Sequence, residues 1–209
     1  HIELDQPSRC VGAYALDTVA DQVCVFSANA VILATGGAGK VYLYTTNPDT
    51  ATGDGIAAAW RAGARVANME FIQFHPTCLY HPHAKSFLIS EALRGAGAIL
   101  RNELGDAFMH KYDDRLELAP RDIVSRAIVA EIASQNNPFV YLDTTQVNIA
   151  TLNTHFPTIK EECMLRIGLH IEKEFIPIIP VQHYSCGGIK VDEFGETSIG
   201  GLFAIGEVA

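Results

Sequence analysis

The sequence predicts a mixed α/β and α+β fold in which one domain is inserted into another. Helical and extended segments are mixed along the chain, without the strict alternation that a wholly parallel sheet requires. The 209 residues, of which 48% are hydrophobic and 19% charged, suffice for one large domain or two small ones. We expect boundaries near residues 69 and 184, which divide the chain into 1–68, 69–184 and 185–209.

The N-terminal segments are predicted to be mainly extended. Residues 10–16 and 22–28 are typical of two short strands that form a hairpin. Residues 30–35, Ala-Val-Ile-Leu-Ala-Thr, are followed by the glycine-rich residues 36–39. A short apolar run of this kind fits a buried strand, and the glycines fit a tight turn after it.

Three helices are predicted from capping residues and apolar spacing. The first covers residues 52–62 and begins with Thr52 as its cap. The second covers residues 86–94. The third runs over 120–134, with Pro120 as a first helical residue that tolerates the missing N–H. Its apolar stripe consists of Ile123, Val124, Ala127, Ile128 and Ile132.

The remaining predicted elements are shorter. A further helix is expected over residues 158–167. Residues 174–181 are expected to be extended, and Pro177 and Pro180 indicate an edge strand because proline cannot donate to a ladder. Other short strands are expected near residues 98–103, 139–142, 189–191 and 202–205.

Composition excludes several classes of partner. The net charge of −9 implies no general affinity for nucleic acid or for an anionic membrane, and no apolar run reaches membrane-spanning length. The five cysteines are scattered and odd in number, which indicates free thiols in a reducing cytoplasm. Because the chain opens on His1 without an initiator Met, we expect it to be part of a longer protein.

Two histidines are the first candidates for a functional site. His75 lies in the segment Gln-Phe-His-Pro-Thr, where Pro76 keeps the backbone extended and the imidazole could donate to a carboxylate. His183 lies shortly before the glycine pair 187–188, which indicates a backbone that approaches another group closely. Taken singly, each histidine is a weak signal: a histidine before a proline is usually structural, and His183 could equally be a satisfied histidine in a turn.

A second group of candidates combines hydroxyl, carboxylate and guanidinium groups. Ser90 and Arg94 share a helix face if the helix extends that far, and Glu91 could position a cationic partner. Arg121 falls in the first turn of a predicted helix, where a cation opposes the helix dipole. Such a local conflict favours a functional role over a surface arginine balanced by Asp122.

A metal site is an alternative interpretation of one histidine-rich run. His75, Cys78, His81 and His83 follow the dense spacing H-x-x-C-x-x-H-x-H. Two prolines stiffen the run, and no second cluster of ligands pairs with it. We therefore expect no metal.

The order of these segments carries more information than any one of them. Together they resemble the capping domain of the succinate dehydrogenase/fumarate reductase flavoproteins through QFHPT (73–77), SEALRGAG (90–97), LAPRD (118–122) and HYSCGG (183–188). Three flanking segments resemble that superfamily's flavin domain, namely ATGGAG (34–39), ATGDG (51–55) and GLFAIGE (201–207). The resemblance covers essentially the whole chain.

Within the superfamily, the details resemble the L-aspartate oxidase family. They are LYHP (79–82), EALR (91–94), ELAPRDIV (117–124) and Cys186 before the glycines. Where this chain has SEALRGAG (90–97) and HYSCGG (183–188), dehydrogenases and reductases more often have T-E-G-C-R-G-E-G and H-Y-M-M-G-G. Ser90 stands where the family usually has Thr, which keeps the hydroxyl, whereas Ala96 replaces a usual Glu and loses its hydrogen bond.

The resemblance implies oxidation of L-aspartate to iminoaspartate by FAD, which feeds quinolinate and NAD synthesis. Oxygen or fumarate would reoxidise the flavin, and quinolinate synthase is a candidate partner. His75, Ser90 and His183 match substrate-binding positions, Arg121 matches the arginine of proton transfer, and Glu91 is its neighbour. Because arginine is effectively always protonated, it stays open whether Arg121 shuttles a proton or only clamps a carboxylate.

The flavin site implied by the resemblance is incomplete in this chain. Thr35, Gly36, Gly37, Asp54 and Glu207 match flavin-contact positions, and Glu207 would accept a hydrogen bond from a ribose hydroxyl. The strand–GxGxxG–helix that binds the FAD pyrophosphate is absent from the sequence, as is the family's second substrate arginine. The alternatives are a succinate dehydrogenase or fumarate reductase subunit and a non-catalytic binding fragment.

Overall fold

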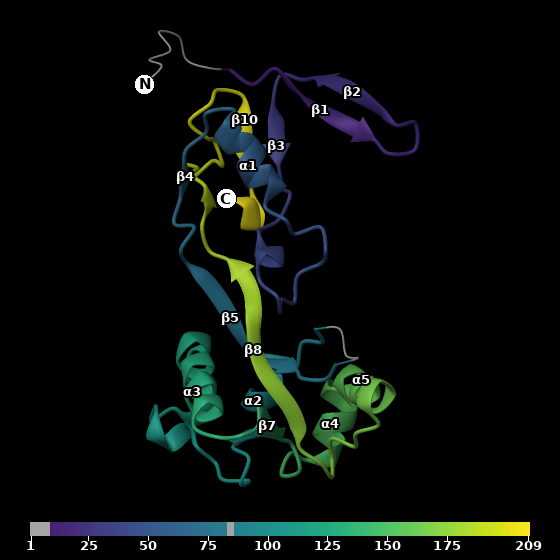
Figure 1. Ribbon diagram of the computed structural model, residues 1–209, viewed down its shortest axis with the longest axis vertical. Helices are drawn as coiled ribbons and strands as arrows, with labels where there is room; N and C mark the ends of the chain where they lie inside the picture. Colours follow the sequence, from purple (N-terminus) through teal and green to yellow (C-terminus); the bar gives the residue numbers. More distant parts are fainter. Residues whose placement is uncertain (1–8, 83–85) are drawn as a thin grey trace. The chain divides into compact units, whose positions relative to one another are not determined.

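The computed structural model describes residues 9–82 and 86–209 and divides them into two compact units. The first unit takes its residues from 1–43, 47–72 and 184–209, and the second consists of 44–46 and 73–183. Figure 1 shows the ribbon of both units, coloured along the sequence from purple at the N-terminus to yellow at the C-terminus. The second unit is thus inserted into the sequence of the first, and only residues 44–46 depart from this arrangement.

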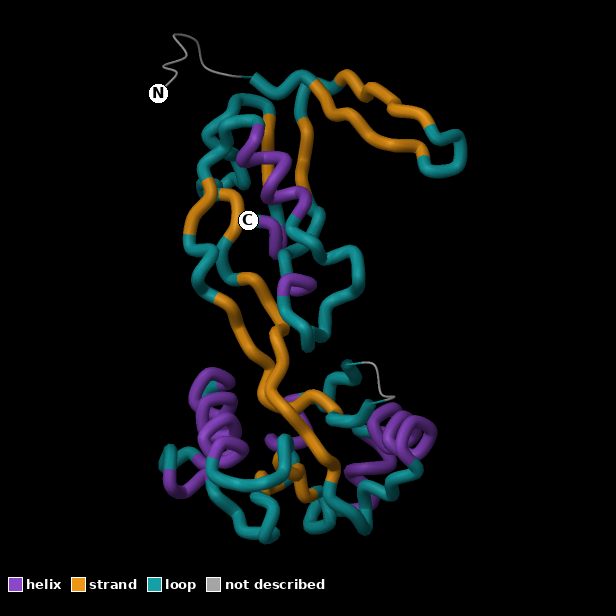
Figure 2. The backbone as a smooth tube through the Cα atoms, viewed as in Figure 1, coloured by secondary structure: helices purple, strands orange, loops and turns teal. Residues whose placement is uncertain are grey.

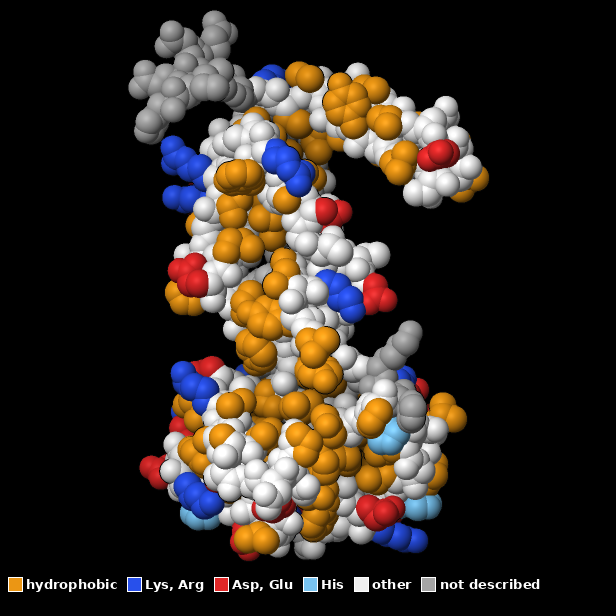
Figure 3. Space-filling view, in the orientation of Figure 1, with side chains coloured by type: hydrophobic (Ala, Val, Ile, Leu, Met, Phe, Trp, Pro, Cys, Tyr) orange, Lys and Arg blue, Asp and Glu red, His pale blue; other side chains and the backbone are white. Residues whose placement is uncertain are grey.

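The first unit contains the expected hairpin and a short parallel pair. Strands β1 (Gly12–Asp17) and β2 (Gln22–Ser27) pair antiparallel, which confirms the hairpin. Most of their side chains are exposed, including the apolar ones visible over the hairpin in Figure 3. Strand β3 (Val31–Leu33) pairs in parallel with β10 (Leu202–Ala204), so two segments far apart in the sequence form one sheet.

Helix α1 (Asp54–Arg61) packs in the core of this unit. Its predicted cap was wrong: Gly53, in a left-handed conformation with φ of 76°, precedes the helix, and Thr52 instead donates to the Asp54 carboxylate at 2.9 Å. The sequence also did not predict β4 (Val66–Ala67), which pairs antiparallel with β9 (Gly188–Ile189). The buried core consists of Ile56, Ala59, Ala64, Ile189, Ile199, Leu202, Ala204 and Val208.

The second unit is built on a four-stranded sheet in the order β5-β8-β7-β6. These strands are β5 (Ile72–Leu79), β8 (Ile176–Ser185), β7 (Val140–Asp143) and β6 (Ile99–Arg101). Figure 2 shows the strands in orange beside the helices of the same unit.

The prediction that residues 174–181 form an edge strand was wrong, because β8 lies between β5 and β7. Pairing with β7 covers residues 176–178, so Pro177 is one of the paired residues and lies opposite Tyr141. Pro177 takes part through its carbonyl, which accepts from the Tyr80 amide at 2.9 Å. Pro180 lies beyond the three residues that pair with β7.

Among the described residues of this unit are four α-helices: α2 (Glu91–Gly95), α3 (Arg121–Ala133), α4 (Ile149–His155) and α5 (Pro157–Ile167). The sequence did not predict α4, whose cap is Asn148. Four short 3-10 turns complete the described elements, at Gly39–Val41, Met109–Lys111, Leu116–Leu118 and Gly206–Val208.

Two predicted helix starts need correction. The helix expected over 86–94 begins only at Glu91, because the residues before it are held extended: the Ile89 amide donates to the Thr77 carbonyl. Pro120 is not a helical residue, since its φ of −52° and ψ of 151° are those of an extended residue before α3. Arg121 is therefore the first residue of its helix.

The core of the second unit fixes these helix starts in place. From α3 it receives Val124, Ala127 and Ile128, all at most 1% exposed, with Ile123 and Ile132 partly buried at its border. Burial of a large apolar side chain contributes about 1.5–3 kcal/mol, so this face holds the helix firmly. No helix among the residues described is long and apolar enough to span a bilayer.

Candidate active site

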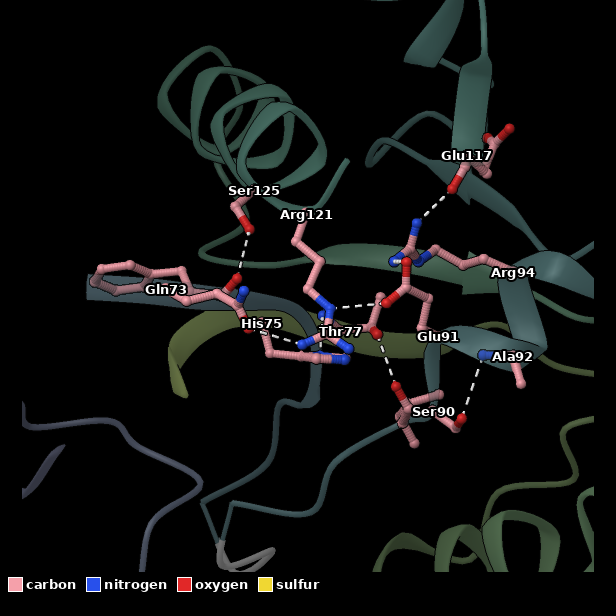
Figure 4. Close-up of polar contacts among 12 residues, drawn as sticks. Gln73, His75, Thr77, Ser90, Glu91, Ala92, Arg94, Glu117, Arg121 and Ser125 are labelled. Carbon is pink, nitrogen blue, oxygen red and sulfur yellow. Dashed lines mark hydrogen bonds and ion pairs between the residues drawn. The ribbon is translucent and has the colours of Figure 1, made fainter. Parts of the chain in front are cut away.

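The second unit gathers charged side chains at the starts of two helices beside β5. Figure 4 shows the Arg121 side chain reaching from the start of α3 toward Glu91 at the start of α2. Arg121 Nε donates to Glu91 Oε2 at 2.7 Å, and its Nη1 donates to Gln73 Oε1 at 2.8 Å. Arg121 thus sits at the unfavourable end of its helix dipole with two acceptors that compensate its charge.

Arg94 extends this arrangement, and the sequence analysis gave it no role. Its side chain is 1% exposed, its Nη2 lies 3.3 Å from Glu91 Oε1, and its Nη1 donates to the Glu117 carbonyl. The Glu91 carboxylate therefore bridges two guanidinium groups, one through each oxygen. The spacing of Glu91 and Arg94, three residues apart at a helix start, was the available signal for this contact.

The electrostatics of the bridge keep the Glu91 carboxylate charged. The hydrogen bond from Arg121 is the largest cause that holds the pKa of Glu91 below its ordinary value, and nearby Arg94 acts in the same direction. Burial lowers the pKa of Arg94, as does Arg121, whereas Glu91 raises it. The bridge is thus a cation–anion–cation array with part of its surface open, since the Glu91 side chain is 45% exposed.

Two imidazoles lie in the same unit. His75 on β5 is 1% exposed, and its ring centroid lies 5.2 Å from that of His183 on β8 in an edge-to-face arrangement. The Thr77 amide donates to His75 Nδ1 at 3.2 Å, so the neutral ring carries its proton on Nε2. Burial, followed by the charge of Arg121, lowers the pKa of His75 from 6.5 to about 3.

The low pKa of His75 predicts a pH effect on stability. The free energy of unfolding of the complete protein should fall as the pH falls from 6.5 to about 3, and His75→Gln is expected to make this fall less steep. In this range the unfolded chain binds a proton that native His75 does not, so its contribution is complete above pH 6.5 and is lost as the pH falls toward 3. The loss is at most about 1.4 kcal/mol per pH unit.

Urea unfolding at several pH values measures this slope. The exposed histidine at the end of α4 provides the control, because His155→Gln makes the same substitution away from the buried ring of His75. Equal slopes for His75→Gln and the parent would show that His75 takes up its proton normally in the native state.

Ser90 lies beside this array as the residue that caps α2. It is exposed, and its hydroxyl oxygen accepts from the Ala92 amide at 3.2 Å. The cap uses an oxygen lone pair, so the hydroxyl hydrogen remains a donor for a ligand. The structure therefore brings Arg121, Glu91 and His75 into one electrostatic group, with Ser90 adjacent to Glu91 in the chain.

The residues matched to flavin contacts lie in the first unit. A Cβ atom at Gly37 would lie 2.5 Å from Glu207 Oε1 and 2.6 Å from Ser185 Oγ, so a larger residue there would displace both side chains. Glu207 Oε1 accepts from the Ser185 amide at 2.7 Å, and Ser185 Oγ accepts from the Ala38 amide at 3.1 Å. The Glu207 carboxylate is thereby fixed against a backbone that carries no side chain.

The other three flavin candidates lie near the same turn. Gly36 has a φ of +76°, a conformation that favours glycine, and Thr35 packs so closely that a Cβ at Gly55 would lie 1.8 Å from its hydroxyl. Asp54 is exposed in the first turn of α1.

A cavity of about 630 Å³ in this unit is lined in part by Ala38, Thr52 and Gly53. The unit thus offers room for a bulky ligand, and in Glu207 it offers a carboxylate, fixed by hydrogen bonds, that can accept from a hydroxyl group. FAD is such a ligand, so the residues present fit part of a flavin site.

The structure bears on the metal alternative only in part. Among the described residues, no three His, Cys, Asp or Glu side chains gather as a metal site requires. His83, one of the four residues of that alternative, lies outside the described part of the chain.

Comparison with known proteins places the chain in a family. The model of the FAD binding domain matches residues 2–209. L-aspartate oxidase 1 of Ralstonia nicotianae is 59% identical over 96% of this chain, and L-aspartate oxidase of Pseudomonas aeruginosa is 55% identical over 98%. The chain spans 38% of the length of each of these relatives.

Solved structures give a similar result. Escherichia coli quinol fumarate reductase superposes with a TM-score of 0.87 at 36% identity, over 95% of this chain and 36% of that one. Mycobacterium smegmatis Sdh1 gives a TM-score of 0.73 at 38% identity, over 96% of this chain and 34% of that one. Because the family model covers residues 2–209, the chain belongs to the FAD binding domain family, in which it is homologous to L-aspartate oxidases.

Proposed function

We propose that the complete protein oxidises L-aspartate to iminoaspartate with FAD, in the synthesis of quinolinate and NAD. The observation that carries this proposal is the Arg121–Glu91–Arg94 array beside His75, in a chain 59% identical to an L-aspartate oxidase. Aspartate has two carboxylates, and the unit offers several donors that can hold them. FAD, when bound, would supply the acceptor for the two electrons that leave Cα.

Residues of the second unit would bind the substrate and take up its proton. Oxidation of Cα removes one hydrogen with its electron pair, and one proton leaves the amino nitrogen. His75, Ser90 and His183 bind and orient the substrate carboxylates through N–H and O–H donors. Arg121 either receives the proton or clamps a carboxylate against the acceptor.

The array provides a physical route for the first of these roles. A guanidinium can take up a proton only if it has just given one away, because arginine is otherwise always protonated in proteins. Glu91, in contact with Arg121 Nε at 2.7 Å, is the group that can accept that proton. Arg94, on the other side of the carboxylate, would stabilise the charged form of Glu91 and so help it return the proton.

We assign the two units accordingly. The second unit would be the capping domain that binds substrate, close to the expected range 69–184, and the first would be part of the flavin domain, in 1–68 and 185–209. Thr35, Gly36, Gly37, Asp54 and Glu207 would contact FAD, with Glu207 accepting from a ribose hydroxyl. The five cysteines are free thiols in the structure, which supports a cytoplasmic location.

A dicarboxylate dehydrogenase or fumarate reductase is the second candidate. The structural similarity to E. coli quinol fumarate reductase favours it, because the fold and site type are shared. Cys186 before the glycine pair and the sequence of residues 91–94 favour the oxidase. Oxygen or fumarate would be the electron acceptor of the oxidase, and quinolinate synthase is the proposed consumer of its product.

An amine-release assay on the full-length protein tests this assignment. With L-aspartate, we expect the flavin band to bleach without oxygen and ammonia to appear as the imine hydrolyses. Succinate, which has no amino group, is expected to leave the flavin oxidised. Bleaching by succinate alone would assign the dehydrogenase class, and no bleaching by either acid would leave a binding function.

The proposal also predicts how this chain behaves alone. The 209-residue chain is expected not to retain FAD, because it contains no pyrophosphate-binding turn to hold the phosphates at a helix N-terminus. Incubation with excess FAD, removal of free flavin and a visible spectrum measure the retention. The full-length protein provides the control, and a stoichiometric flavin band on the short chain would contradict the prediction.

A further inference from the structure

Residues 44–46 have contacts that differ from those of their neighbours in the sequence. Residues before and after them belong to the first unit, whereas these three belong to the second. The Thr46 amide donates to the Gln182 carbonyl at 3.0 Å, and the Gln182 amide donates to the Tyr44 carbonyl at 3.2 Å. Thr45 and Gln182, 5% and 0% exposed, are joined by a side-chain hydrogen bond. The segment is thus fixed to β8 directly before His183.

This short segment places the hydroxyl of Thr46 beside the imidazole of His183 in the candidate active site. Thr46 Oγ1 lies 2.8 Å from His183 Nδ1. The contact parallels that of His75, whose Nδ1 accepts from the Thr77 amide at 3.2 Å. In both rings Nδ1 is held by the protein, so a substrate carboxylate would meet Nε2.

We propose that Thr46 is a positioning residue that donates its hydroxyl hydrogen to His183 Nδ1 and thereby keeps the Nε2–H tautomer. The neutral rings of His75 and His183 then both present an N–H to a carboxylate. With the other tautomer, His183 would direct a lone pair at that anion, which is repulsive. The carboxylate ligand in this argument rests on the proposed function, whereas the tautomer itself does not.

The tautomer is measured without any substrate. In full-length protein labelled with ¹⁵N-histidine, the shifts of the two ring nitrogens show which one carries the proton, and loss of the signal in His183→Gln identifies the ring. We expect the parent and Thr46→Ser to have the proton on Nε2. Thr46→Val, which keeps the shape but loses the hydroxyl, is expected to populate the Nδ1–H form. A parent ring with its proton on Nδ1 would overturn the proposal, whatever the substrate is.

Binding of malonate measures the consequence for ligands. Malonate has two carboxylates but no neighbouring pair of C–H bonds to oxidise, so the flavin absorbance change reports binding alone. A hydrogen bond to a charged group contributes about 1.5–3 kcal/mol, so Thr46→Val is expected to raise the Kd at least about tenfold.

Thr46→Ser should bind malonate within about twofold of the parent, and so should Thr154→Val, an exposed threonine of α4 that gives the same chemical change. A Thr46→Val variant that keeps both the Nε2–H tautomer and the parent's Kd would also overturn the role of Thr46. A Thr46→Val variant that keeps the Nε2–H tautomer but binds malonate more weakly would also contradict the proposal, because Thr46 would then affect binding without setting the tautomer.

Discussion

Arg121→Lys in the complete enzyme is expected to slow flavin reduction by L-aspartate by about two to four orders of magnitude, the usual contribution of a positioned proton-transfer group. Arginine contacts Glu91 through Nε and Gln73 through Nη1 at the same time. Lysine keeps the charge but has a single ammonium in place of the planar fork, so it cannot reproduce both contacts. Substrate binding should survive in part.

The alternative role of Arg121 gives a different kinetic result. If Arg121 only clamps a carboxylate, the loss should appear as weaker binding with kcat nearly intact. Dissociation constants from flavin absorbance, measured beside single-turnover flavin reduction, separate the two. Reduction at the parent's rate under saturating aspartate would exclude proton transfer by Arg121.

A second arginine of the same helix provides the matched control. The Arg126 side chain is 76% exposed and pairs with Asp122 at 2.5 Å, one turn back along α3. Arg126→Lys makes the same chemical change without a contact to Glu91, and exposed pairs of this kind contribute little. It should leave both flavin reduction and aspartate binding at the parent's values.

Local sequence patterns predicted the elements whose side chains follow one clear period. The apolar stripe of α3 is an example and is confirmed, as is the hairpin expected from two short strand-like segments. The start of α2 was misplaced because tertiary pairing of Ile89 with Thr77 holds the preceding residues extended. The edge assignment of β8 failed for a similar reason: Pro177 pairs opposite Tyr141 of β7, and β5 lies on the other side of β8, so tertiary pairing overrides the local preference of proline for an edge.

The sequence predicted the segments of the candidate site one by one. It could not predict the contacts between their side chains. Motif order suggested Arg121, Glu91 and His75, but only the fold shows that Glu91 lies between two guanidinium groups. Thr46 gave no signal, because an isolated threonine in a loop has no period or spacing that points to a histidine 137 residues away. Such long-range contacts depend on topology, which local propensity does not encode.

Glu91→Gln is expected to lower the rate of flavin reduction by about a hundredfold or more if the bridge carries the proton. The amide is nearly the same size, and its oxygen can still accept from Arg121. Its NH₂ group, however, would face Arg94 donor to donor, and it cannot take up a proton at neutral pH. The charge that offsets buried Arg94 is also lost, so the variant should unfold at lower urea concentration.

Two comparison variants separate proton transfer from a structural effect. Glu162→Gln breaks the ion pair of Glu162 with Arg166 within α5, outside the array, and should leave flavin reduction unchanged. Glu91→Asp keeps the charge and should restore part of the rate. If Arg121 and Glu91 act as one unit, Arg121→Lys combined with Glu91→Gln should be scarcely slower than the slower single variant, because the second change removes a function already lost. Rate losses that multiply in the double variant would mean that the two residues act separately, and the bridge would then hold the site together without carrying the proton.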